Sequence, residues 1–162
     1  MSINVGQMAP DFKLPNTEKE FFTLSQFNGK NNVLLLFIPF AFTGVCTTEL
    51  CSVRDDIARY TSAGAEVLAI SIDSPFALKR FKEEQNLPFQ LLSDFNKEAI
   101  TAFGNGYAEF SCGLKGVAKR SAFVIDKNGL IQYAEVLESA GDLPNFEAIN
   151  KVLAGLNQVI LK

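Results

Sequence analysis

Residues 39–46 lie between the apolar run Val33–Ile38 and a helix-like stretch that begins near Gly44, and they read Pro39-Phe40-Ala41-Phe42-Thr43-Gly44-Val45-Cys46. A continuous apolar run is typical of a central strand that is buried on both faces. Cys46 is therefore expected in the first turn of a helix, near unpaired N–H groups and the positive end of the helix dipole, which stabilise a thiolate. The segment predicts sulfur chemistry, although a small buried Cys that fills a strand–helix corner is the common alternative.

Strands and helices are predicted to alternate on both sides of this segment. After a strand or turn at Phe21–Leu24, we expect strands over Asn32–Ile38, Glu66–Asp73 and Pro88–Leu92. Each of these strands is followed by a helix: Thr47–Ala63, which stops at Gly64, then Ser74-Pro75 to about Asn86, then Asn96–Phe103. A loop over Gly104–Lys119 then leads to two strands, Ser121–Asp126 and Leu130–Val136, joined by an Asn-Gly turn at Lys127–Gly129, and to a last helix over Asn145–Leu156. Alternation makes a parallel region, to which the hairpin adds antiparallel strands. The prediction is an α/β, thioredoxin-like fold with a mixed central sheet flanked by helices, in one domain over residues 1–162.

Composition excludes several kinds of site. The chain has no histidine, which removes Ser-His and Cys-His nucleophile pairs and His-ligated metal sites. With three cysteines, and with Cys46 and Cys51 at the outer edge of the usual zinc spacing, we expect no metal site. A net charge of −3 without a basic stripe argues against nucleic acid as a partner. Neither a membrane span nor a signal peptide is evident, so we expect a cytoplasmic protein that does not bind membranes.

Four residues carry a resemblance to a known family. Pro39, Thr43 and Cys46 form the Pro-x-x-x-Thr-x-x-Cys motif of peroxiredoxins, and Arg120 in the segment Lys119–Asp126 matches that family's second active-site segment. The chain resembles peroxiredoxins of the AhpC/TSA type from Gly6 through the hairpin. The sequence of residues 39–46 is most similar to that of the one-cysteine alkyl hydroperoxide reductase E group. The Cys-x-x-Cys of thioredoxin itself is absent, which argues against a general disulfide reductase.

The resemblance implies a thiol-dependent peroxidase that reduces hydrogen peroxide and organic hydroperoxides without a cofactor. The Cys46 thiolate would attack a peroxide oxygen and become a sulfenic acid. Arg120 would stabilise the thiolate and donate hydrogen bonds to the peroxide, Thr43 would orient both, and Pro39 would fix the backbone and shield the sulfur. Taken alone, Thr43 would be a helix N-cap and Arg120 a surface charge at a strand end.

Glu49 is a carboxylate three residues after Cys46, and it matches an acidic residue of many peroxiredoxins. We expect it to pair with an arginine such as Arg54, or to act only as a favourable carboxylate in the first helical turn. It is not assigned to the catalytic set.

Recycling of the oxidised cysteine has three possible routes. Cys51 matches the resolving position of the bacterioferritin-comigratory (Q) group, and a Cys46–Cys51 disulfide would require the helix to unwind locally. Cys112 in the Gly-rich loop competes for this role, and in a one-cysteine cycle an external thiol attacks the sulfenic acid directly. The resemblance also implies a thioredoxin-like thiol reductant and a homodimer. A peroxide-sensing redox switch that acts on a partner is the alternative function.

Overall fold

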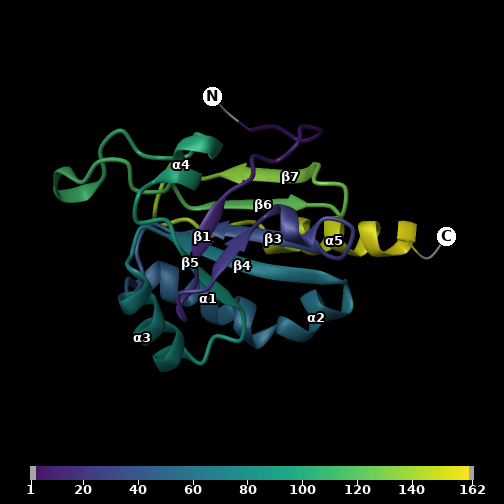
Figure 1. The fold of residues 1–162 in the computed structure, drawn as a ribbon, viewed down its shortest axis with the longest axis horizontal. Coiled ribbons are helices and arrows are strands. Elements are labelled where there is room, and N and C mark those ends of the chain that lie inside the picture. The colour runs from purple at the N-terminus through teal and green to yellow at the C-terminus, as the bar shows by residue number, and fades with distance from the viewer. Residues whose placement is uncertain (1–2, 161–162) are drawn as a thin grey trace.

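A five-stranded mixed sheet forms the centre of the structure, a computed structural model that describes residues 3–160 (Figure 1). The outermost residues of the predicted domain, 1–2 and 161–162, lie outside the described part of the chain. The strands are β3 (Asn32–Phe37), β4 (Ala65–Ser71), β5 (Gln90–Ser93), β6 (Ser121–Ile125) and β7 (Ile131–Val136). Their order in the sheet is β5-β4-β3-β6-β7. Strands β3, β4 and β5 are parallel to one another, whereas β6 is antiparallel to both of its neighbours, β3 and β7. The predicted mixed sheet is confirmed.

Both faces of the sheet are covered, because successive side chains of a strand point to opposite sides. The helices are α1 (Gly44–Asp55), α2 (Ile57–Ser62), α3 (Pro75–Gln85), α4 (Glu98–Phe103) and α5 (Phe146–Ile160). The even-numbered apolar residues of β3, such as Leu34 and Leu36, pack in one core with α1, α3 and α5, whereas Val33 and Leu35 pack in a second core with α4 and the N-terminal segment. All six residues of β3 are buried as a result.

Smaller elements complete the fold. A second sheet pairs β1 (Lys13–Pro15) with β2 (Phe21–Thr23), followed by the short 3-10 helix η1 (Ser25–Phe27). The predicted strand or turn at Phe21–Leu24 is therefore a strand. In the described part of the chain, every helix is too short or too polar to cross a membrane.

Two predicted segments differ from the structure in detail. The helix expected over Thr47–Ala63 begins at Gly44 and is broken at Asp56, where the backbone leaves the helical region (φ −117, ψ 21). Aspartate is a weak helix former, which is consistent with a break there. The expected loop over Gly104–Lys119 is present and carries a 3-10 turn, η2 (Ser111–Gly113), in the arm that extends away from the sheet beside α4 in Figure 1.

Candidate active site

The four residues of the predicted motif line one pocket at the carboxyl end of β3. The pocket has a volume of about 330 Å³. Its walls are Pro39, Phe40, Thr43, Gly44, Val45, Cys46, Phe110, Arg120, Ala140 and Gly141. Most of these residues are apolar, so Cys46 and Arg120 face each other in a low-polarity environment, in which electrostatic interactions are strong.

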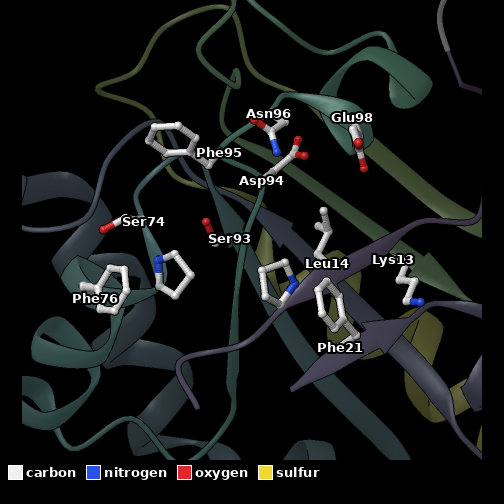
Figure 2. A pocket seen from close by; sticks show the side chains of 12 residues that line it. Lys13, Leu14, Phe21, Ser74, Phe76, Ser93, Asp94, Phe95, Asn96 and Glu98 are labelled. Atoms are coloured by element: carbon white, nitrogen blue, oxygen red, sulfur yellow. The ribbon is translucent and has the colours of Figure 1, made fainter. Parts of the chain in front are cut away.

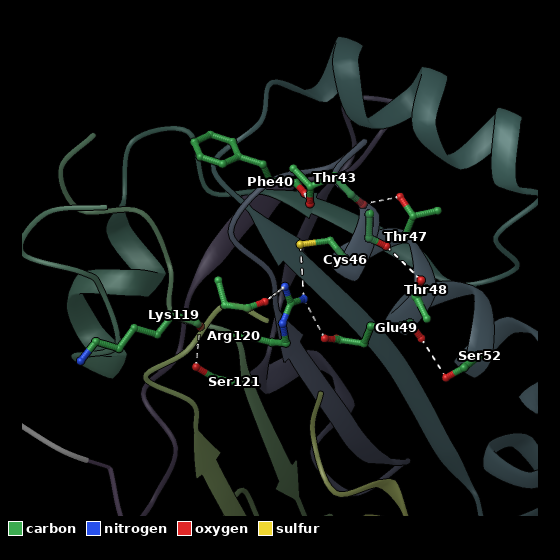
Figure 3. Close-up of polar contacts among 12 residues, drawn as sticks. Phe40, Thr43, Cys46, Thr47, Thr48, Glu49, Ser52, Lys119, Arg120 and Ser121 are labelled. Atoms are coloured by element: carbon green, nitrogen blue, oxygen red, sulfur yellow. Dashed lines mark hydrogen bonds and ion pairs between the residues drawn. The ribbon is translucent and has the colours of Figure 1, made fainter. Parts of the chain in front are cut away.

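Cys46 is hydrogen-bonded to Arg120 across a long sequence separation. Cys46 is the third residue of α1 and is 1% exposed, and Arg120 comes directly before β6. The antiparallel pairing of β3 and β6 places Ser121 opposite Phe37, which brings Arg120 to the end of β3. Arg120 Nη1 donates to Cys46 Sγ at 3.3 Å, although the two residues are 74 positions apart (Figure 3). The alternative that Arg120 is an exposed strand-end charge is wrong, since this residue is 1% exposed.

The Arg120 guanidinium is held by three acceptors. Besides the thiol, Nη1 donates to Glu49 Oε1 at 3.0 Å and Nη2 donates to the Ala140 carbonyl at 2.9 Å. Desolvation acts to lower the pKa of Arg120, but the neighbouring Glu49 and Cys46 outweigh it and raise that pKa. The guanidinium therefore stays charged and is fixed in one orientation beside the sulfur.

The expected pairing of Glu49 with an arginine is confirmed, but its partner is Arg120 and not Arg54. Glu49 is wholly buried and pairs with Arg120, whereas Arg54 donates to Asp55 and to the Gln85 carbonyl. The signal was present in the sequence, because helical spacing puts position 49 on the same face as Cys46, Leu50 and Val53. A carboxylate on a buried face requires a buried cation.

Burial changes the ionisation of Glu49. Desolvation raises the pKa of Glu49 to about 7, against the lowering effect of Arg120. The second carboxylate oxygen, Oε2, has no hydrogen-bond partner among the described residues, so the charged form is only half satisfied. Glu49 therefore titrates close to neutral pH.

Thr43 and Pro39 shape the backbone that leads into α1. Thr43 occupies the N-cap position, but its hydroxyl donates to the Phe40 carbonyl at 2.9 Å and makes no capping bond. The N-cap alternative is thus right about the position and wrong about the side chain. The hydroxyl oxygen at the pocket wall keeps its capacity to accept a hydrogen bond. Pro39 is buried directly after Ile38 and lines the pocket.

The three cysteines are all free and lie in different environments. Cys51 is on α1, and its thiol donates to Gln85 Oε1 of α3 at 3.3 Å. Five helical residues correspond to a rotation of about 140° and a rise of about 7.5 Å, so the structure does not bring Cys46 and Cys51 together. Cys112 is exposed in η2, two residues after Phe110, whose ring lies 6.1 Å from that of Phe40 in the pocket wall.

The chemistry of this arrangement is that of a stabilised sulfur nucleophile. A buried thiol beside a fixed guanidinium, at the start of a helix, favours the thiolate. The Arg120 guanidinium beside the sulfur can also stabilise negative charge that develops on an attacked oxygen, and a preorganised donor of this kind lowers the barrier for displacement at that oxygen.

Comparisons with known proteins identify the family. Residues 5–134 match the model of the AhpC/TSA family. The chain is 36% identical over 154 residues to alkyl hydroperoxide reductase E of Mycobacterium tuberculosis, which covers 95% of this chain and 98% of that protein. It is 37% identical over 132 residues to peroxiredoxin Bcp of Escherichia coli, which covers 81% and 84% of the two chains.

The fold agrees with this relationship. The crystal structure of peroxidoxin BcpB from Mycobacterium tuberculosis matches with a TM-score of 0.82 and 28% identity, over 97% of this chain and 98% of that one. The predicted thioredoxin-like fold and the resemblance to the alkyl hydroperoxide reductase E and bacterioferritin-comigratory groups are both confirmed. This chain belongs to the AhpC/TSA family and is a peroxiredoxin, a thiol-dependent peroxidase.

Proposed function

We propose that Cys46 is the peroxide-reducing thiol of this peroxiredoxin and that Arg120, Thr43 and Pro39 complete its active site. The observation that carries the proposal is the hydrogen bond from the buried Arg120 guanidinium to Cys46 Sγ. The Cys46 thiolate attacks one oxygen of the hydroperoxide and the O–O bond breaks. The other oxygen leaves with a proton as water or an alcohol, while the cysteine is oxidised to a sulfenic acid.

The pocket walls support organic hydroperoxides as substrates alongside hydrogen peroxide. Hydrogen peroxide has no apolar part, whereas this pocket of about 330 Å³ presents Phe40, Val45 and Phe110. An alkyl group that contacts these side chains would be removed from water, which adds about 25 cal/mol per Å² of apolar area to binding. The name of the relative alkyl hydroperoxide reductase E is consistent with this substrate class.

For recycling, we propose that Cys51 resolves the sulfenic acid. Its thiol would displace the hydroxyl of oxidised Cys46, releasing water and forming a Cys46–Cys51 disulfide that a thioredoxin-like dithiol then reduces. This step requires α1 to unwind, because the two thiols lie on different sides of the intact helix. The break at Asp56 supports it, since α1 is a separate helix that can open without α2.

Peptide mapping after oxidation tests both assignments. We expect one equivalent of hydrogen peroxide to remove two hydrogens from the reduced protein and to cross-link the peptides of Cys46 and Cys51. Cys46→Ser should leave peroxide unconsumed, and Cys51→Ser should hold Cys46 as a sulfenic acid. Cys112→Ser is the matched control, because it removes an exposed thiol outside the pocket walls and should react as the wild type does.

Each contrary outcome has a defined meaning. Cys46 that stays unmodified while peroxide persists contradicts the assignment of the reactive thiol. A disulfide that still forms in Cys51→Ser moves the resolving role to Cys112 or a partner thiol. A stable sulfenic acid in the wild type would point to a one-cysteine cycle with an external thiol.

A homodimer is proposed from exposed phenylalanines along one edge of the sheet. Phe42, Phe76 and Phe95 follow β3, β4 and β5 and are 51%, 69% and 64% exposed. Phe76 and Phe95 also border a pocket of about 470 Å³ together with Phe21 (Figure 2). Clustered exposed aromatic rings are typical of an interaction surface, and a second copy of the chain is the partner we propose.

The oligomeric state can be measured by light scattering on a sizing column. We expect the wild type to run at twice the chain mass of 17.8 kDa, and the double variant Phe76→Glu/Phe95→Glu to run as a monomer because charge cannot be buried in that interface. Val5→Glu, at a residue of similar exposure (58%) in the N-terminal segment, is the control and should stay dimeric. A wild-type monomer would contradict the proposal.

We further propose that the protein works in the cytoplasm, where its free thiols would stay reduced.

A further inference from the structure

The loop that leads into α1 contains a residue in an unfavourable backbone conformation. This segment, Pro39–Thr43, is called the Cys46 loop below. Phe42 has φ +70, in the left-handed region that residues other than glycine rarely adopt. Such a conformation persists only where surrounding interactions hold it. One of these interactions is local, from the Thr43 hydroxyl to the Phe40 carbonyl.

A second interaction reaches the Cys46 loop from the end of β4. The Ala41 N–H, directly before the strained residue, donates to Asp73 Oδ2 at 2.8 Å, although the two residues are 32 positions apart. Ala41 is 6% exposed and Asp73 is half-buried, so this hydrogen bond is only partly open to competition from water. Asp73 is thus the side chain from outside the loop that fixes the backbone at its strained point.

Asp73 is itself held by two neighbouring strands. The Ser71 hydroxyl donates to the same Asp73 oxygen at 2.7 Å and accepts from the Asp73 N–H at 3.1 Å. The Ser93 hydroxyl, at the end of β5, donates to the Asp73 carbonyl at 2.6 Å. The carboxyl ends of β3, β4 and β5 are therefore joined through one aspartate.

We propose that Asp73 is a positioning residue for the peroxidase reaction, holding the Cys46 loop through the Ala41 N–H so that α1 presents Cys46 to Arg120. This inference rests on the proposed role of Cys46. Cys46 and Arg120 come from different segments, on α1 and before β6, and their 3.3 Å contact survives only if the Cys46 loop keeps its path. Asp73 is absent from the walls of the Cys46 pocket, so its effect is indirect.

The geometry also separates the hydrogen-bonding role of Asp73 from its charge. Both hydrogen bonds to its side chain fall on the single oxygen Oδ2. An asparagine offers one carbonyl oxygen that can accept both bonds, whereas alanine offers none. Asp73→Asn should therefore preserve the loop, and Asp73→Ala should release it.

The test follows oxidation and alkylation of Cys46 in a background of Cys51→Ser and Cys112→Ser, so that one thiol is observed. We expect Asp73→Ala to slow oxidation of Cys46 by hydrogen peroxide about tenfold, the size of effect that one lost, partly buried hydrogen bond has on a barrier. The pH profile of Cys46 alkylation by iodoacetamide should move to higher pH, because the contact with Arg120 is loosened. Asp73→Asn should restore both readouts to within about threefold of the background protein.

Asp126→Ala is the matched control. Asp126 is also half-buried and accepts from two backbone N–H groups and from Gln132. It lies in the hairpin turn between β6 and β7, at the end of the sheet where β3 begins, whereas Asp73 lies at the end where β3 and β4 finish. It should lose stability without changing the rate or the pH profile of Cys46. If Asp73→Ala does not fold, Ser71→Ala serves in its place, since it removes one support of Asp73 and should slow oxidation about threefold.

The outcomes distinguish this inference from the proposed function. Oxidation of Asp73→Ala at the background rate overturns the positioning role, and so does an Asp73→Asn variant as slow as Asp73→Ala, which would assign the effect to charge. A background protein whose Cys46 does not react with peroxide would instead overturn the proposed function.

Discussion

Replacing Arg120 with Met is expected to slow the reaction of Cys46 with peroxide at least about 100-fold, the usual effect of removing a preorganised donor from a buried reaction centre. The same change should also lower the free energy of unfolding, by an amount that grows above about pH 7 towards about 3–5 kcal/mol, because loss of the Arg120 charge leaves the buried Glu49 carboxylate without its partner. Both effects have one structural cause, since a single guanidinium nitrogen contacts Cys46 Sγ and Glu49 Oε1. Stopped-flow oxidation and urea unfolding measure them separately.

Further variants separate catalysis from stability. Adding Glu49→Gln to Arg120→Met removes the unpaired charge, so we expect it to recover much of the unfolding free energy and none of the rate. Arg120→Lys keeps a charge but loses the planar guanidinium that reaches three acceptors. Its oxidation rate and its free energy of unfolding should therefore lie between those of the wild type and Arg120→Met. Lys119→Met is the matched control, because Lys119 contacts neither Cys46 nor Glu49 and its ion pair with the exposed Glu138 is worth about 0–1 kcal/mol. If the double variant regained the wild-type rate, Arg120 would have a structural role alone.

Replacing Glu49 with Gln is expected to change how stability depends on pH. The pKa of Glu49 is raised by burial from 4.5 to about 7 in the folded protein, so between these values the unfolded chain releases this proton while the folded chain keeps it. The wild type therefore loses stability as pH rises from about 4.5 to about 7, by about 3 kcal/mol at 1.36 kcal/mol per pH unit. The amide introduced by Glu49→Gln does not titrate, so the variant lacks this loss.

Urea unfolding of the two proteins from pH 4.5 to 8 measures the difference. We expect the stability of Glu49→Gln relative to the wild type to increase with pH through this window and to level off above it. Glu84→Gln is the control, since Glu84 is part of an exposed pair with Arg80 and should show no such trend. Parallel curves for Glu49→Gln and the wild type would contradict the raised pKa of Glu49.

Local sequence was sufficient to predict most of the fold. The apolar run of β3, the alternation of strands and helices along the chain and the Asn-Gly hairpin predicted a mixed sheet, because side-chain periodicity follows directly from strand and helix geometry. The break at Asp56 was missed, since no Gly or Pro marks it and helical periodicity continues on both sides. Cys46 was placed correctly in the first turn of a helix, because a strand that runs into a helix defines that turn locally.

By itself, then, the sequence determined the sheet, the start of α1 and the four motif residues that meet in the pocket. Only the tertiary structure decided that Glu49 pairs with Arg120, that Phe110 forms a pocket wall and that Asp73 holds the Cys46 loop. Periodicity shows which side chains are buried, but not which buried groups become neighbours. That is set by the order in which strands pair, with β6 and β4 on either side of β3, and so by contacts between residues far apart in the chain.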